Sequence, residues 1–121
     1  MTIAEKIRNE KNEALKDFDF ETLGRFIEDK LKTSSFIYIG ICCDWQFERG
    51  SLKRGFLSKE YITDCPWLVF SGYTCGYWNT SCHIPQRYYK EIIAWCKEQG
   101  LKASWKGLAG FDTPDVIMVS L

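Results

Sequence analysis

The stretch Phe36-Ile37-Tyr38-Ile39-Gly40-Ile41-Cys42-Cys43 decides the fold of this chain. Side chains alternate across a β-strand, so every second residue shares a side. One side would be lined by Phe36, Tyr38 and Cys42, and the other by Ile37, Ile39, Ile41 and Cys43. Both sides are apolar, and a strand with two apolar faces is covered on both. We therefore expect residues 36–43 in the middle of a sheet, with the rest of the chain packed on or beside them.

Two helices are predicted before this strand. Thr2 and Glu5 form a capping box that starts the first helix, which should run to about Lys16. Its apolar positions are sparse and residues 8–13 are wholly polar, so this helix docks only partly or docks on a partner subunit. Asp19 is the expected cap of the second helix. The apolar stripe of that helix consists of Phe20, Leu23, Ile27 and Leu31.

The middle of the chain has weaker patterns. Residues 44–50 could extend the central strand or open a loop, and residues 51–62 fit a loop or the end of a hairpin. Residues 66–73 are the second strongly predicted strand, since proline is tolerated at a strand start. Glycines and an Asn-Thr pair then predict a turn region, with a short strand possible at Tyr77-Trp78.

The last third predicts a helix and two strands. Pro85 suits the first turn of the helix, and Gly100 suits its left-handed C-terminal cap. Residues 101–105 alternate in polarity and residues 116–121 are almost wholly apolar, which favours a hairpin joined by residues 107–114. The expected fold is a single α+β domain over residues 1–121. It has a mostly antiparallel or mixed sheet of four or five strands, with helices packed on one face.

Composition narrows the function classes. The 121 residues carry 16 basic and 16 acidic side chains, so the chain has no total field that attracts nucleic acid and does not mimic DNA. We expect no sequence-specific binding to duplex DNA. Apolar runs fall short of the ~20 residues that span a bilayer, and the polar start is unlike a signal peptide. A cytoplasmic location is therefore expected, with no membrane partner and with the six cysteines as free thiols.

One alternative is a zinc-stabilised interaction domain. Cys65, Cys75, Cys82 and His83 are four ligand types that zinc accepts. Structural zinc sites usually pair ligands two to four residues apart, whereas Cys82 and His83 are adjacent and their side chains diverge. We therefore predict no metal and no cofactor.

A second alternative is a small cytoplasmic enzyme that uses Cys82 or His83. A helix N-terminus lowers the pKa of a nearby thiol, and His83 is the only histidine. A Cys–His enzyme needs the two side chains to face each other, which adjacent residues seldom do. We expect no catalytic residues.

Aromatic and cationic residues give the main candidate site, because aromatic rings stack on bases and arginine and tryptophan anchor protein interfaces. They fall in two groups within segments expected to be irregular. The predicted binding residues are Trp45, Arg49 and Arg54 after the central strand, and Tyr73, Tyr77, Trp78, His83 and Arg87 before the third helix.

The chain resembles small prophage-encoded proteins that begin with a capped polar helix and end with a helix, a glycine and a closing strand pair. The matching pieces are residues 1–7, 91–101 and 116–121. Proteins of this type include anti-CRISPR inhibitors and sponges that sequester nucleotide signals. The resemblance implies a stoichiometric binder and carries over no functional residues.

These observations predict a non-enzymatic phage accessory protein that antagonises a bacterial defence system in the host cytoplasm. Its partner would be a defence protein or a small nucleotide. For a nucleotide, Arg54 or Arg87 would hold the phosphate. The sparse first helix favours a homodimer.

Overall fold

The computed structural model describes residues 1–49, 52, 54–75, 78–107 and 113–121, and gives only the backbone of residues 56, 72–75, 78 and 79. Its helices are α1 (Ile3–Leu15), α2 (Phe20–Leu31), α3 (Asp44–Glu48) and α4 (Tyr89–Glu98), with 3₁₀ segments at η1 (Phe56–Lys59) and η2 (Gln86–Tyr88). Its strands are β1 (Phe36–Cys42), β2 (Val69–Cys75), β3 (Trp78–Pro85), β4 (Lys102–Lys106) and β5 (Val116–Ser120). Within the described residues, no helix combines the length and apolarity that crossing a bilayer requires.

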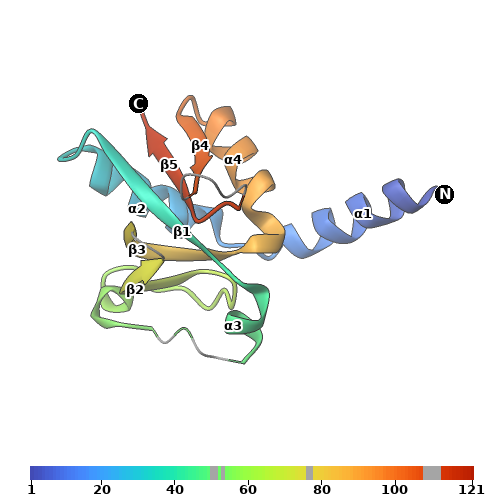
Figure 1. Cartoon of the computed structure of the whole chain (residues 1–121), viewed down its shortest axis with the longest axis horizontal. Helices are drawn as coiled ribbons and strands as arrows, with labels where there is room; N and C mark the ends of the chain where they lie inside the picture. The colour runs from blue at the N-terminus through green and yellow to red at the C-terminus, as the bar shows by residue number, and fades with distance from the viewer. Residues whose placement is uncertain (50–51, 53, 76–77, 108–112) are drawn as a thin grey trace.

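The strands form one mixed sheet in the order β2-β3-β1-β5-β4, so β1 is central, as predicted (Figure 1). Strand β1 runs parallel to β3 and antiparallel to β5. The pairs β2–β3 and β4–β5 are antiparallel, and the second of these is the predicted terminal hairpin. The predicted α+β class with a mixed sheet is confirmed.

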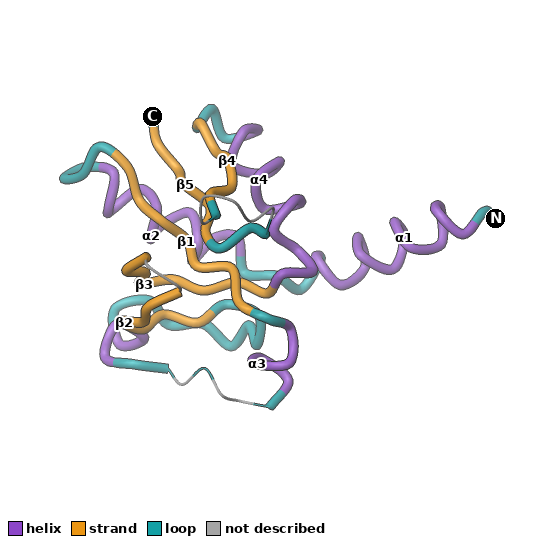
Figure 2. Tube along the Cα trace, viewed as in Figure 1, coloured by secondary structure: helices purple, strands orange, loops and turns teal. Residues whose placement is uncertain are grey.

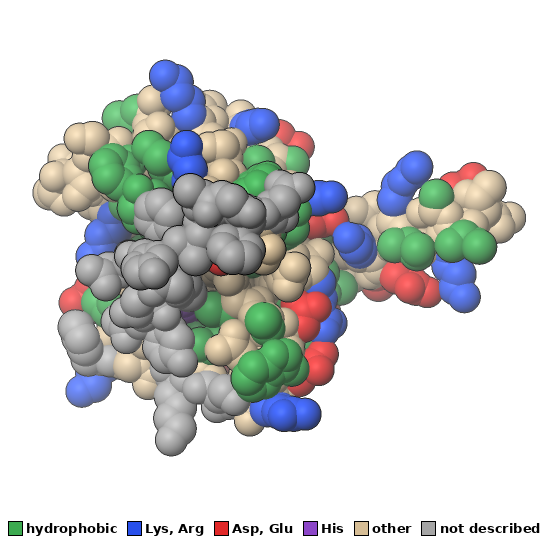
Figure 3. Space-filling view, in the orientation of Figure 1, with side chains coloured by type: hydrophobic (Ala, Val, Ile, Leu, Met, Phe, Trp, Pro, Cys, Tyr) green, Lys and Arg blue, Asp and Glu red, His purple; other side chains and the backbone are tan. Residues whose placement is uncertain are grey.

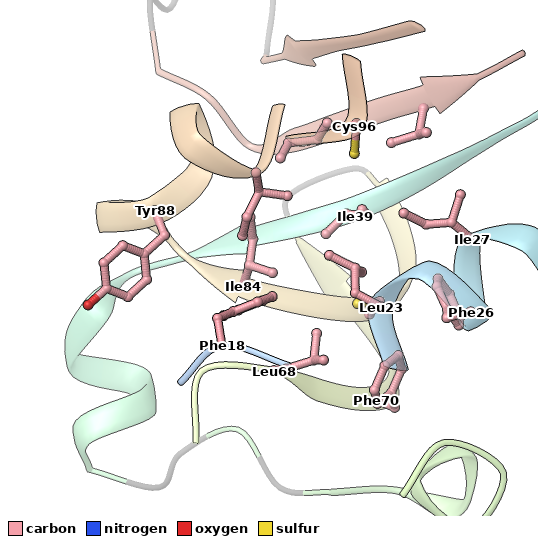
Figure 4. Packing of buried hydrophobic residues seen from close by; sticks show 14 of the residues in the cluster. Phe18, Leu23, Phe26, Ile27, Ile39, Leu68, Phe70, Ile84, Tyr88 and Cys96 are labelled. Atoms are coloured by element: carbon pink, nitrogen blue, oxygen red, sulfur yellow. The ribbon is translucent and has the colours of Figure 1, made fainter. Parts of the chain in front are cut away.

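Helices α2 and α4 cover one face of the sheet and enclose the main core (Figure 4). Leu23 and Phe26 enter it from α2, and Ile92 and Cys96 enter it from α4. They meet Ile39 from the central strand, and all five side chains are buried. The prediction that β1 needs cover on this face is therefore confirmed.

The segment that was expected to form turns contains most of β3. Residues 78–85 are a full strand that pairs with β1 on one side and β2 on the other. The polar run Asn79-Thr80-Ser81 hid the alternation that Cys82 and Ile84 complete, with both of these side chains buried. Tertiary pairing here overrides the local preference for turns.

Residues 44–48 form helix α3, so the expectations of a strand extension or a loop were both wrong. Strand β1 ends at Cys42, and Cys43 is the N-cap of α3 rather than a strand residue. The Gln46 side chain accepts a hydrogen bond of 3.0 Å from the Cys43 backbone N–H. The second predicted strand also starts later than expected, at Val69.

The predicted caps at Thr2, Asp19 and Gly100 are confirmed, whereas Pro85 is the last residue of β3 and α4 begins later than expected, at Tyr89. The Glu5 backbone N–H donates to Thr2 Oγ1 at 3.1 Å, and the Thr22 backbone N–H donates to Asp19 Oδ1 at 3.0 Å. Gly100 has a φ of +81°, the left-handed conformation that ends α4 at little steric cost.

Helix α1 extends away from the rest of the molecule (Figures 1 and 2). It contains no buried residue, and only Ala14 and Leu15, in its last turn, pack against the core. Ile3 is 79% exposed and Ile7 is 48% exposed. The expectation that this helix docks only partly on its own chain is confirmed.

Candidate functional site

Helix α3 presents an aromatic and a basic side chain together. Trp45 is 48% exposed, and the Arg49 guanidinium carbon lies 5.5 Å from its ring centroid. This distance is typical of a cation–π contact. We call the exposed surface made by Trp45, Arg49 and the neighbouring carboxylates Asp44 and Glu48 the α3 platform. In Figure 3, hydrophobic atoms at the position of α3 are flanked by acidic and basic side chains.

Arg87, which lies just before α4, holds α3 in place. Its Nε is 3.2 Å from Asp44 Oδ2, and its Nη2 is 2.5 Å from Glu48 Oε1. Its backbone N–H also donates to Asp44 Oδ1 at 3.0 Å. A helix of five residues is too short to be stable alone, so these contacts explain why α3 is helical and where it lies.

The Arg87 guanidinium also stacks on an aromatic ring. Its guanidinium carbon lies 4.6 Å from the Trp67 ring centroid, and Trp67 meets Tyr88 edge-on at 6.0 Å. Burial alone would lower the pKa of Arg87, but hydrogen bonds and charge from Glu48 and Asp44 outweigh it and raise the pKa. Arg87 is therefore a fixed cation that supports the α3 platform.

The only histidine is in the sheet rather than in an exposed loop. His83 is fully buried in β3, in register with Gly40 of β1. Its Nε2 is 3.1 Å from the Ser71 carbonyl oxygen, which can only accept, so Nε2 carries a hydrogen. Its Nδ1 faces Cys42 Sγ at 3.7 Å and Thr80 Oγ1 at 3.4 Å.

Two cysteines of the zinc alternative, Cys65 and Cys82, pack in the main core, and only the backbone of Cys75 is described. Cys82 is adjacent to His83 but points to the opposite, helix-covered face, where it packs in the main core. Burial raises the pKa of the Cys82 thiol, and it raises that of the Cys96 thiol to about 11. Among the residues that the structure describes, no three His, Cys, Asp or Glu side chains are arranged to hold a metal ion.

The structure brings together only some of the predicted binding residues. Trp45, Arg49 and Arg87 meet at α3, whereas Arg54 is exposed on the segment before η1 and donates to the Cys65 carbonyl at 3.0 Å. His83 is buried, so it belongs to no exposed surface. Tyr73 and Trp78 lie in β2 and β3 with only their backbone described, and Tyr77 lies outside the described residues.

The sequence pattern did not identify three residues of this region as site residues. Asp44 and Glu48 are four residues apart, the spacing of one helical face, but this signal is hidden while residues 44–50 are taken as strand or loop. Trp67 was assigned to a strand, although it precedes β2 and stacks under Arg87. Its pairing with a residue 20 positions away leaves no local signal.

Comparisons of the chain with protein-family models, with curated proteins and with solved structures gave no match.

Proposed function

We propose that this protein is a non-enzymatic phage accessory protein that antagonises a bacterial defence system by binding a protein effector stoichiometrically. The single observation that supports it best is the α3 platform. Trp45 and Arg49 are exposed together on an element that Arg87 already fixes. Tryptophan and arginine are the residue types most enriched among interface hot spots, and a rigid surface loses less entropy on binding. The phage origin rests on the resemblance of the chain to prophage-encoded proteins.

A protein effector fits this surface better than a nucleotide signal. Arg87 is the predicted phosphate ligand beside α3, but it is paired with Asp44 and Glu48. These two carboxylates would also repel a phosphate group held nearby. A mixed surface of tryptophan, arginine and carboxylates instead suits the charged and aromatic groups of another protein.

A thiol enzyme is the second candidate, and one observation favours it. The Cys42 Sγ lies 3.7 Å from His83 Nδ1, so the histidine faces a thiol after all, although a different one from Cys82. Against this candidate, Cys42 is buried beside Leu52 and Val69, and His83 is fully buried. A nucleophile of that kind would need a route for its substrate.

A phage plating assay tests the proposal. The protein is expressed in bacteria that carry a defence system, and the plating of a sensitive phage is compared with that of an empty vector. We expect plating to rise for the wild type and to fall by at least about tenfold for Trp45→Ala combined with Arg49→Ala, the size of a hot-spot loss.

Two variants serve as controls. Trp105→Ala removes a tryptophan that is 39% exposed on β4, away from α3, and should keep the wild-type effect. Cys42→Ala removes the thiol that lies against His83 and should also keep the wild-type effect. Loss of the effect in Cys42→Ala, with a folded protein and an unchanged α3 double variant, would support the thiol enzyme instead.

A further inference from the structure

A groove between α2 and α4 offers a concave, mostly apolar surface. Its volume is about 800 Å³. The floor consists of Phe20, Gly24, Ile27 and Leu31 from α2, Trp95 from α4, and the terminal Leu121. Gly24 lies beside Trp95, where a β-carbon would be 3.4 Å from the indole ring, so this part of the floor is formed by the helix backbone and the ring. A groove of this form suits the apolar face of a helix.

Helix α1 has an apolar stripe whose N-terminal part is exposed. Ile3, Ile7 and Ala14 fall on one side of the helix at helical spacing. Ala14 packs against the core, but Ile3 and Ile7 continue the same stripe past the edge of the molecule, where both are exposed. The part of α1 that is free to dock, residues 3–10, is about 12 Å long at 1.5 Å per residue. The groove follows α2 over positions 20–32, so it is long enough to hold this part of the helix.

The helix cannot reach the groove of its own chain. The C-terminal part of α1 is held on its own chain, because Lys11 Nζ lies 3.4 Å from Glu91 Oε1 of α4 and Leu15 packs against the core. Only residues 16–19 join α1 to α2, and Phe18 among them is buried. The N-terminal end of α1 therefore points away from the body (Figure 2).

The position at which α1 leaves the body favours a second copy of the chain as the partner that fills the α2/α4 groove. Glu91, Trp95 and Gln99 follow one another at four-residue spacing on α4, so the contact with Lys11 lies in line with the groove. Two copies related by a two-fold axis would each place α1 in the groove of the other. Such a symmetric exchange forms the same contact twice and closes the assembly.

The charges beside the two surfaces are compatible. The α2 rim of the groove carries Glu21 and Arg25, four residues apart. Along one edge of the Ile3–Ile7 stripe, α1 carries Lys6 and Glu10, also four residues apart and of the opposite sign. A parallel approach of α1 to α2 brings both pairs together.

We propose that the protein is a two-fold dimer in which the apolar stripe of α1 from each copy docks into the α2/α4 groove of the other. The proposal is independent of the function proposed for α3, because its test measures oligomeric state alone.

The test is the mass of the full chain in solution, measured by sedimentation and native mass spectrometry over a range of concentrations. We expect a species of twice the 14.1 kDa chain mass. Ile7→Glu should weaken the dimer by at least about tenfold, as burying a charge removes the apolar contact. Asn12→Glu adds the same charge to the opposite side of α1 and should leave the dimer intact. Ile7 is exposed, so its substitution should not affect folding.

A second variant tests the groove itself. Gly24→Glu places a carboxylate on the floor and should also weaken the dimer at least about tenfold, and glutamate favours a helix more than glycine does. Circular dichroism checks its fold, and Leu121→Glu, at the other end of the groove, replaces it if the fold is lost.

Mixing the two variants separates this dimer from other arrangements. Chains with Ile7→Glu keep a good groove, and chains with Gly24→Glu keep a good α1. One of the two contacts is therefore intact in a mixed dimer, which should form more readily than either variant alone. A monomeric wild type would overturn the proposal. So would a Gly24→Glu protein that dimerises like the wild type, since that result means that the α1 helices pair with each other.

Discussion

At the scale of single residues, His83 and Gly40 show how a polar ring is placed inside a sheet. The two residues are in register across β1 and β3, so the buried imidazole lies beside a residue that has no side chain. The register between β2 and β3 shifts between Phe70 and Tyr73, and His83 donates to the Ser71 carbonyl within this interval. The histidine therefore joins strands where regular pairing is interrupted.

Replacing His83 by leucine should reduce the free energy of unfolding by about 1–3 kcal/mol, because the buried Ser71 carbonyl then loses its donor. Urea unfolding followed by tryptophan fluorescence measures the change. Gln86→Leu removes an exposed polar side chain nearby and should change the same quantity by less than about 0.5 kcal/mol. Equal stability of the His83 variant and the wild type would mean that this bond contributes nothing.

The Asp19 carboxyl makes the folding stability depend on pH in the acidic range. Burial alone would raise the pKa of this carboxyl, but hydrogen bonds from Thr22 and Thr63 outweigh it and lower the pKa below its usual 3.8. A lowered pKa in the folded state means that the charged form stabilises the fold above about pH 4. That contribution is lost as the pH falls through the lowered pKa.

We expect Asp19→Ala to cost about 1 kcal/mol at pH 7, the usual effect of removing a helix N-cap. The difference in the free energy of unfolding between the variant and the wild type should decrease below pH 4. Denaturant unfolding at several pH values measures it, and a gap that widens in acid would contradict the assignment.

At the scale of elements, α3 depends on contacts made far along the chain. Its carboxylates Asp44 and Glu48 bind Arg87, which in turn stacks on Trp67. The orientation of the whole α3 platform is thus set by one arginine just ahead of α4.

Replacing Arg87 by alanine should destabilise the protein by about 1–2 kcal/mol, through the lost ion pairs and ring contact of a partly exposed group. Helix α3 should also loosen, which hydrogen exchange at residues 44–49 would detect. Arg87→Lys keeps the charge but not the planar fork, so it should rescue the helix only in part. Unchanged exchange in the alanine variant would show that α3 is held by other contacts.

The elements that the sequence predicts correctly are those with local signals. The central strand, the caps at Thr2, Asp19 and Gly100, and the terminal hairpin all follow from alternation or from capping chemistry. Strand β3 and helix α3 were missed because their stability comes from tertiary pairing. For the same reason His83 was predicted to lie in a loop, and Trp67 was not among the predicted binding residues.

At the scale of the whole molecule, the sheet has its main core on one face, under α2 and α4. Helix α3 and the Leu52 segment contribute a smaller cluster around Cys42 and Val69. The predicted site residues that meet on the surface, Trp45 and Arg49, project from this second, smaller layer. His83, Cys42 and Cys82 are buried, whereas Trp45 and Arg49 are exposed, and this contrast is the physical basis for proposing a binder.

The most direct test is a titration of a defence effector that the protein inhibits, carried out at two effector concentrations and several incubation times. A stoichiometric binder predicts that the amount needed for full inhibition rises in proportion to the effector and stays constant with time. The combined Trp45→Ala and Arg49→Ala variant should need at least about ten times more protein. Inactivation of excess effector by a small amount of protein, growing with time, would contradict the account.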